Sequence, residues 1–416
     1  MITPSFNLTA TERVLPKLAL DFTTASLDSR VTFTRTTGAS NPATYVNSSG
    51  YIAAATNNQP RFDYNPVTLA CNGLLIEESR SNELSYSDDF ANAAWTPNNA
   101  TISSNVVTSP DGTSNADKLI PNSGAVSYAS VFRSRGIASQ KTMSVYMKAA
   151  EKTVGWLGWL GGSNGAYFNL STAQATTFGS GTAATITPAG NDWYRCSITY
   201  TYASGNGNIF VGCTDAVGSL SCTGNGSDGL YIWGHQYEAG AFATSYIPTT
   251  TAALTRNADV ATMTGTNFSD WYNPTEGAME FSYAMVGVKS TASQRLVQLD
   301  DGTETSRIAN FITSSNSLQT TIVIPVGNPG SFNPPAVVIT PNTIYTQAFA
   351  YKQNNCQSAL DGVSREPPDT EVDIPTVTVW RVASSAAGVV SSNLWLRTLN
   401  YWPQRLLSAE LAAFTK

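Results

Sequence analysis

Charged side chains are scarce in this chain of 416 residues, at 12% of the sequence, which is about half the usual share of roughly 25%. Ser, Thr, Asn and Gly fill the polar positions instead. The formal net charge is −6, and basic residues nowhere form a run of five. Because docking on nucleic acid or on an anionic membrane surface needs clustered Lys and Arg, the composition argues against both partners.

Long apolar runs are also missing. No stretch approaches the roughly 18 apolar residues that a membrane helix needs. The opening residues, MITPSFNLTATERVLPKLAL, have neither the basic start nor the apolar centre of a signal peptide. The sequence therefore predicts no membrane insertion and no signal peptide.

Cysteines are few, odd in number and without a C-x-x-C pair; they are Cys71, Cys196, Cys213, Cys222 and Cys356. This usage predicts reduced thiols. Cys213 and Cys222 flank a glycine-bearing loop that could close a hairpin. A disulfide between them stays open as an alternative, since the sequence does not give the Cα separation that the bond requires.

Short β-type runs recur between clusters of Gly, Asn, Ser and Pro, and the 3.6-residue period of a helix is almost missing. Apolar residues alternate with small or polar ones from Met279 to Met285, as in a strand with one buried face. Residues 345–351 and 394–401 are further predicted strands. The sequence thus predicts an all-β protein.

One short helix is expected at the end of the chain. Ser408 can serve as its N-cap, and Glu410 lies favourably in the first turn. Leu411 and Phe414 are three apart and so share one face. We expect this helix to pack against the edge of a sandwich.

Two glycine motifs resemble catalytic or nucleotide-binding signatures. Gly161–Gly165, GGSNG, fits the nucleophile elbow of a serine hydrolase, but no helix follows and the chain has one histidine. Gly224–Gly229, GNGSDG, fits a dinucleotide fingerprint, which needs a helix where a strand is predicted. We interpret the first motif as a hairpin loop and the second as a turn.

Asp369, Glu371 and Asp373 alternate, so on a strand their carboxylates would share one face, as the acid/base pairs of glycosidases do. Prolines on both sides favour a loop instead. A solvated loop is our first interpretation, a weak calcium site the second and catalysis the last.

The single histidine, His235, could hold a metal or a ligand. Its neighbours at alternate positions, Trp233 and Tyr237, indicate a packed strand face. A structural role is therefore preferred.

Trp156 and Trp159 are the candidate glycan-binding residues, because flat aromatic rings stack on the C–H faces of sugars. The two are three apart and would point to opposite faces of one strand. The alternative is that they belong to the core, as we expect for Trp193 and Trp233.

Several segments carry a resemblance to modular bacteriophage virion proteins with a carbohydrate-binding-module-like β-sandwich. The main ones are GLLIEESRSNEL at Gly73–Leu84 and LYIWGHQYEAGAFATSYIPTTTAALTRNAD at Leu230–Asp259. Between them, DGTSNADKL, SVYMKA and NDWYRCSITYT look like parts of such modules. Three later segments are similar to laminin-G or concanavalin-like lectin domains: Asp270–Tyr283, Ala359–Gly362 and Leu394–Phe414.

The resemblance implies tandem antiparallel β-sandwiches of jelly-roll type after a small N-terminal β segment. The expected division is a lead-in or attachment segment at 1–85, a carbohydrate-binding-module-like sandwich at 86–262, and a concanavalin- or laminin-G-like sandwich at 263–416. The GLLIEE(x)R(x)N element is expected where the first segment ends and the first sandwich begins.

The function that the resemblance implies is a structural component of a virion, either a fibre, a spike or a capsid decoration, made in the host cytoplasm. Its N-terminal segment would contact other virion proteins, its sandwiches would bind a host-surface glycan, and a homo-oligomer, for example a trimer, is expected. No enzyme activity and no cofactor are expected, apart from the calcium alternative.

Two other functions stay open. One is a passive protein that covers or cements the capsid, which buried Trp156 and Trp159 would favour. The other is a glycan-degrading tail enzyme, which needs two carboxylates about 5 to 9.5 Å apart. The sequence does not distinguish head from tail.

Overall fold

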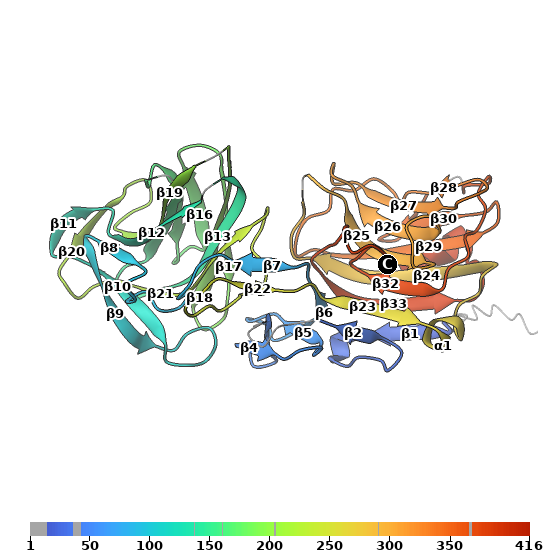
Figure 1. Ribbon diagram of the computed structural model, residues 1–416, viewed down its shortest axis with the longest axis horizontal. Coiled ribbons are helices and arrows are strands. Elements are labelled where there is room, and N and C mark those ends of the chain that lie inside the picture. The colour runs from blue at the N-terminus through green and yellow to red at the C-terminus, as the bar shows by residue number, and fades with distance from the viewer. Residues whose placement is uncertain are drawn as a thin grey trace, which may run out of the picture.

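The computed structural model describes residues 15–35, 43–136, 138–159, 161–203, 205–289, 291–365 and 368–416. Two lobes of β-sheet lie side by side, and strands of the N-terminal segment run beneath their junction and beneath the second lobe (Figure 1). None of the helices in these ranges is both long and apolar enough to span a membrane.

The first lobe, here called the central sandwich, packs two sheets that have six strands each within the described residues. One sheet runs in the order β17 (Thr182–Pro188), β18 (Trp193–Tyr202), β13 (Ser139–Ala149), β21 (Leu230–Ala239), β10 (Ala116–Pro121) and β9 (Ala100–Val107). The other runs β16 (Gln174–Phe178), β15 (Asn164–Asn169), β14 (Val154–Trp159), β19 (Asn206–Thr214), β12 (Ser130–Gly136) and β8 (Thr96–Asn98). A two-stranded ribbon of β11 (Gly124–Ser127) and β20 (Ser221–Gly224) lies at one end.

The second lobe, the C-terminal sandwich, packs larger sheets, of eight and seven strands in the described part of the chain. The larger sheet has the order β31 (Val363–Ser364), β30 (Gln357–Leu360), β29 (Ile344–Lys352), β24 (Glu276–Met285), β33 (Leu394–Trp402), β6 (Cys71–Ile76) and β5 (Arg61–Tyr64), with β1 (Leu18–Asp21) also paired to β33. The smaller sheet has the order β2 (Thr32–Thr34), β23 (Val260–Thr264), β32 (Val379–Val382), β25 (Gln294–Asp300), β26 (Arg307–Ile312), β27 (Leu318–Val323) and β28 (Gly330–Ser331). All strand pairs in both lobes that the structure describes are antiparallel.

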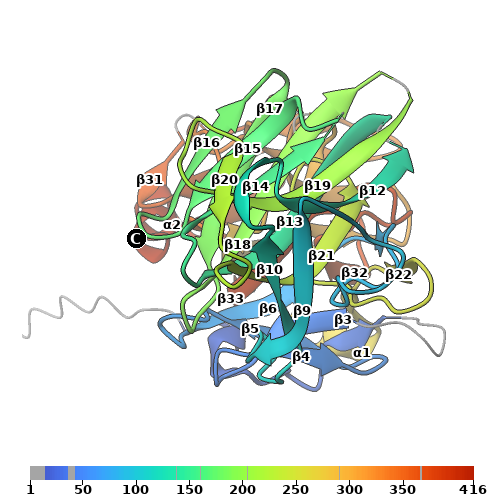
Figure 2. The ribbon, with the colours of Figure 1, turned by 90° about the vertical axis from the view of Figure 1, so that its left-hand side faces the viewer.

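The N-terminal segment shares sheets with the second lobe. Its strands β1, β5 and β6 belong to the eight-stranded sheet and β2 to the seven-stranded one, within the described ranges. The hairpin of β3 (Ala43–Val46) and β4 (Ile52–Ala55) lies outside both sheets, and β7 (Arg80–Asn82) pairs with β22 (Leu254–Arg256) at the junction. Seen end-on from the central sandwich, β3 to β6 lie below it (Figure 2). The described part of the first 85 residues thus completes the C-terminal sandwich and contacts the central one.

The fold class predicted from the sequence is confirmed: the protein consists of tandem antiparallel sandwiches with a short C-terminal helix. The apolar residues predicted to alternate from Met279 to Met285 form β24 and point into the core of the C-terminal sandwich. The strands expected at 345–351 and 394–401 are β29 and β33. Gly161–Gly165 covers the turn of the β14–β15 hairpin, and a strand follows Gly224–Gly229, as expected.

The outer face of β24 is also covered, which the alternation did not predict. Glu280 lies there with only 5% of its surface exposed. It accepts a hydrogen bond from the Asn400 amide at 2.6 Å. Burial raises the pKa of this carboxyl to about 7, while the Asn400 and Thr398 contacts partly oppose that rise. A carboxyl of this kind is more stable in its neutral form when the protein is folded.

Glu280→Gln is therefore expected to stabilise the protein at high pH. The folded-state pKa lies above the ordinary value of 4.5, so stability is lost as the pH rises from about 4.5 to about 7, and the loss persists above that. At pH 8 the variant should exceed the wild type by on the order of 3 kcal/mol, and at pH 4 the two should agree. Urea unfolding at both pH values, with Glu371→Gln in an exposed loop as control, measures this. An equal difference at both pH values would contradict the assignment.

The terminal helix α2 (Ser408–Phe414) packs on the β29–β31 edge of its sandwich, as expected. Leu411 is buried, and the Phe414 ring lies 4.6 Å from that of Trp402. The N-cap prediction was wrong: the cap is Leu407, whose backbone N–H donates to the Glu410 carboxylate at 2.6 Å. The hydroxyl of Ser408 donates to Gln357 instead. Elsewhere in the described residues lie two further short helices, η1 (Phe22–Thr24) and α1 (Thr266–Ser269).

Candidate functional site

A cleft of about 1260 Å³ lies between the two lobes. One wall is the outer face of β17 and β18, and the other is formed by β33, the end of β24 and nearby loops. The N-terminal segment contributes Thr44–Val46 and residues of β5 and β6. The cleft is larger than the roughly 300 to 1,000 Å³ of most small-molecule pockets, so it has room for a chain of several sugar rings.

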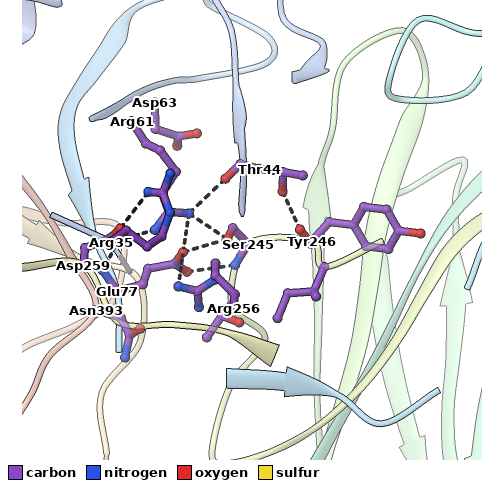
Figure 3. A network of polar contacts seen from close by, with 12 residues as sticks. Arg35, Thr44, Arg61, Asp63, Glu77, Ser245, Tyr246, Arg256, Asp259 and Asn393 are labelled. Carbon is purple, nitrogen blue, oxygen red and sulfur yellow. Dashed lines mark hydrogen bonds and ion pairs between the residues drawn. The ribbon is translucent and has the colours of Figure 1, made fainter. Parts of the chain in front are cut away.

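The lobes are held beside the cleft by a buried cluster of charges, here called the ionic junction: Arg35, Arg61, Glu77, Arg256 and Asp259 (Figure 3). Arg61 on β5 donates to Glu77 at 2.7 Å and also bonds Asp259. Arg35 donates to Asp259 at 2.9 Å, and Arg256 lies 3.2 Å from Glu77. The junction therefore joins the N-terminal segment to the connection between the two sandwiches.

Glu77 is the carboxylate at the centre of the ionic junction. Burial alone would raise its pKa, but Arg256 and Arg61 hold the pKa at about 2. The Ser245 backbone N–H and hydroxyl also donate to it, at 2.8 and 2.6 Å. Glu77 belongs to the GLLIEE element and Asp259 ends the second quoted segment. The two main segments quoted in the sequence analysis, Gly73–Leu84 and Leu230–Asp259, thus meet in space.

The wall formed by the C-terminal sandwich carries an indole and a guanidinium. Trp395 and Arg397 alternate with the core residues Leu394 and Leu396, so both side chains lie on the outer face of β33. The Trp395 indole N–H donates to Asp63 at 2.9 Å. Arg397 donates to the backbone carbonyl of Asn72 at 3.0 Å. Both side chains are half-buried and line the cleft.

Asp63 is buried at the base of this wall and holds its indole in place. It also accepts a hydrogen bond from the Val46 backbone N–H at 2.7 Å. Burial raises its pKa to about 6, although these hydrogen bonds and the charge of Arg61 act in the opposite direction. Asp63 therefore links β3, β5 and β33 through one carboxyl group.

The opposite wall is rich in hydroxyl groups. Thr185 and Ser197 lie 2.6 Å apart, oxygen to oxygen, on neighbouring strands. Arg195 on β18 donates to the Ser144 hydroxyl at 3.0 Å, and its guanidinium lies 5.5 Å from the centre of the Tyr146 ring. This wall offers hydrogen-bond donors and acceptors to a ligand in the cleft.

The cleft also contains half-buried aromatic rings, those of Tyr45, Tyr64, Phe242 and Trp395. Such rings bury apolar area at a low conformational cost, and the hydroxyl and amide groups beside them set orientation. The cleft thus combines apolar ring faces with hydrogen-bonding groups.

The two tryptophans predicted to bind glycan lie in the interior. Trp156 is 0% exposed and Trp159 is 3% exposed. Trp159 stacks on Tyr200 with ring centres 4.2 Å apart, inside the core of the central sandwich. Trp156 points to the other face of the sheet, where it stacks on Phe210 at 5.7 Å within a separate aromatic cluster. The two rings point to opposite faces of the strand, as expected for residues three apart. Neither ring has a free face for a sugar.

His235 is also a core residue, as preferred from the sequence. It is fully buried and stacks on Trp95 with ring centres 5.1 Å apart. Burial, with smaller contributions from Arg133 and Arg135, lowers its pKa to about 3. The pairing of β21 with β13 shifts its register beside Gly234, whose φ is +64°. Trp233 and Tyr237 therefore point to different faces of the sheet and pack in different clusters.

Asp369, Glu371 and Asp373 lie in a loop, as first interpreted. Asp369 accepts hydrogen bonds from the backbone N–H groups of Glu371 and Ser331, at 3.1 and 3.3 Å. Asp373 accepts from the Asn328 N–H at 3.1 Å. Within the described residues, no group of three or more His, Cys, Asp or Glu side chains is arranged to hold a metal ion. The two aspartates thus connect neighbouring loops.

Cys213 and Cys222 come close without bonding. Their sulfur atoms are 4.0 Å apart, and the cysteines in the described residues are free thiols. The structure thus has the free thiols that were predicted. Cys213 on β19 and Cys222 on β20 lie on strands that pair with other strands, so the hairpin that the disulfide alternative assumed is not formed.

The residues that line the cleft were not predicted as a site. Arg195 lies within the NDWYRCSITYT segment quoted above, and Trp395 and Arg397 lie within Leu394–Phe414. Asp63 belongs to the N-terminal segment. The signal available in the sequence was the alternation along each strand. A residue next to a core residue points to the other face of the sheet, away from the core. The sequence did not show that these two outer faces lie on opposite sides of one cleft.

The sequence matches no protein-family model. It also matches no curated protein.

Several solved structures are distantly similar to part of the chain. The sialidase CBM40 of Ruminococcus gnavus shares 15% identity over 36% of this chain and 88% of its own, with a TM-score of 0.29. CBM40 is also known in complex with α2,6-sialyllactose. The NanB sialidase of Streptococcus pneumoniae shares 9% over 36% of this chain and 26% of its own, with a TM-score of 0.28. A SAP-like pentraxin of Limulus polyphemus shares 10% over 34% and 70%, with a TM-score of 0.26. Values this low carry no argument about the site.

Proposed function

We propose that this protein is a structural component of a bacteriophage virion that adheres to host-surface glycans through the cleft between its lobes. The observation that carries the adhesion proposal is the cleft itself. Half-buried aromatic rings line it, with Thr185 and Ser197 facing it from one wall. Its volume exceeds that of most small-molecule pockets and so suits an oligosaccharide chain better than a compact metabolite.

The virion role is supported by the sequence resemblance of Gly73–Leu84 and Leu230–Asp259. Both segments contribute to the ionic junction, so they form one structural unit. The N-terminal segment is proposed to contact other virion proteins. Because its described strands belong to the sheets of the C-terminal sandwich, such an attachment would hold that whole lobe.

Adhesion would be reversible and multivalent. Single sugar contacts are weak, but several copies on one particle raise the effective concentration and can increase affinity by roughly 10² to 10⁴-fold. A homo-oligomer, such as a trimer, would supply those copies.

A second candidate is a passive protein that covers or cements the capsid. The burial of Trp156 and Trp159 favours it, because these rings offer no sugar platform.

For a glycan-degrading enzyme, the relevant described carboxylates of the cleft are Asp63 and Glu77. Both are buried and bonded to the protein's own N–H groups. They are engaged in holding the structure, so adhesion remains the proposal.

Replacing Trp395 with Ala is expected to weaken glycan binding about tenfold or more, because the cleft loses its largest aromatic face. The assay is binding of the purified protein to a glycan array and to whole host cells. Tyr128→Ala, at an exposed ring outside the cleft, is the matched control and should bind normally. If wild-type protein binds neither glycan nor cell, adhesion is rejected and cementing remains. Equal loss in both variants would place the site elsewhere.

A further inference from the structure

The cleft contains two arginines that have no carboxylate partner among the described residues. Arg195 lies on one wall and Arg397 on the other. Neither guanidinium forms an ion pair with a carboxylate in the described part of the chain. Lys289, a third cation of the cleft, differs because it is paired with Glu78. Two half-buried cations thus face the same space, and no described carboxylate is paired with either of them.

Their immediate contacts are neutral. Arg397 donates to the carbonyls of Asn72 and Cys71, at 3.0 and 3.5 Å. Arg195 contacts the Ser144 hydroxyl and the Tyr146 ring. These contacts fix the direction of each guanidinium and leave other N–H groups of the fork for a ligand. Asp63 also lines the cleft, and its carboxyl oxygens accept hydrogen bonds from the Trp395 indole and the Val46 backbone.

The arrangement on β33 is specific. Trp395 and Arg397 are two residues apart on the same face of the strand, roughly 7 Å along it. An indole can stack on the C–H face of a sugar ring while a nearby guanidinium binds a carboxylate on the same or the next ring. Because the whole protein carries a net charge of −6, a site with unpaired cations has a more positive electrostatic potential than an average part of its surface.

We propose that the cleft selects anionic glycans, polysaccharides whose sugars carry carboxylates, with Trp395 as the stacking platform and Arg397 and Arg195 as the carboxylate-binding groups on opposite walls. This inference rests on the proposed function and narrows it to a class of ligand. Bidentate contacts from arginine to a carboxylate would give both orientation and charge selection. Binding would weaken as salt is raised, because part of it is electrostatic.

The test uses the full-length protein and matched pairs of polysaccharides. Each acidic glycan that binds on the array is compared with its carboxyl-reduced form, in which each carboxylate has become a neutral hydroxymethyl group. Reduction should weaken binding to the wild type at least about tenfold. Arg397→Gln and Arg195→Gln should each weaken binding to the acidic form by a similar factor and bind the reduced form as wild type does. Arg365→Gln, an exposed arginine outside the cleft, is the matched control and should change neither.

Melting curves separate a folding defect from a binding defect. Arg397 contacts the backbone, so if Arg397→Gln unfolds, Arg195→Gln carries the test. If the glycans that bind are neutral, or if binding survives carboxyl reduction, the anionic selection is overturned while adhesion stands. If no glycan binds, the proposed function fails and this inference fails with it.

Discussion

Replacing Glu77 with Gln is expected to lower the free energy of unfolding at pH 7 by about 3 to 5 kcal/mol, because it removes one partner from a buried charge cluster. The side chains of Arg61 and Arg256 are 0% exposed and would lose the carboxylate they share. A buried guanidinium without its anion cannot recover hydration. Urea unfolding of the full chain measures the loss. Limited proteolysis of the connection between the lobes should show faster cleavage as the junction loosens.

The matched control is Glu276→Gln, which removes a carboxylate from a more exposed pair with Lys352. A change within about 0.5 kcal/mol is expected there. The pH dependence adds a second check. Because the pKa of Glu77 is lowered to about 2, its contribution is present above pH 4.5 and is lost as the pH falls towards 2. The variant and the wild type should therefore converge in acid. A Glu77→Gln variant as stable as wild type at pH 7 would contradict the role given to the ionic junction.

Trp159→Ala is expected to cost about 3 to 5 kcal/mol of stability while leaving glycan affinity unchanged in the folded protein. The ring fills the core of the central sandwich against Tyr200, and its indole N–H donates to Thr182 at 3.0 Å. Its removal opens a cavity that the surrounding strands can close only in part. Thermal melting measures the first effect, and a binding isotherm taken well below the melting transition measures the second.

The conservative variant Trp159→Phe keeps most of the volume and should recover most of the stability. If Trp159→Ala instead abolished binding in a protein that remained as stable as wild type, the indole would be a ligand contact and its burial here would be the wrong description. That result would return the glycan site to β14.

The sandwiches could be predicted because their signals are local. The alternation from Met279 to Met285 repeats within one strand, and each residue's face follows from its neighbours. The same holds for α2, in which Leu411 and Phe414 lie on one side of a single helix. The N-cap was misplaced by one residue, because the Ser408 hydroxyl donates to Gln357 on β30, a contact that no local pattern predicts.

The site could not be predicted because it depends on contacts between distant parts of the chain. Asp63 and Trp395 are 332 positions apart and share one hydrogen bond. No local pattern shows that the outer faces of β18 and β33 approach each other. The burial of Trp156 also could not be predicted. The alternation along its strand shows which face of the sheet the ring points to, but not that Phe210 from another strand covers it there.

The most direct measurement of the central claim is glycan binding by a variant with a filled cleft. Thr185 is exposed on the wall of β17, so Thr185→Trp adds bulk to the cleft without entering the core. Thr176→Trp makes the same change at an exposed position of β16 outside the cleft. The account predicts that Thr185→Trp melts like wild type and loses glycan and host-cell binding, while Thr176→Trp keeps both. Unchanged binding by a folded Thr185→Trp protein would contradict the assignment of the cleft as the glycan site.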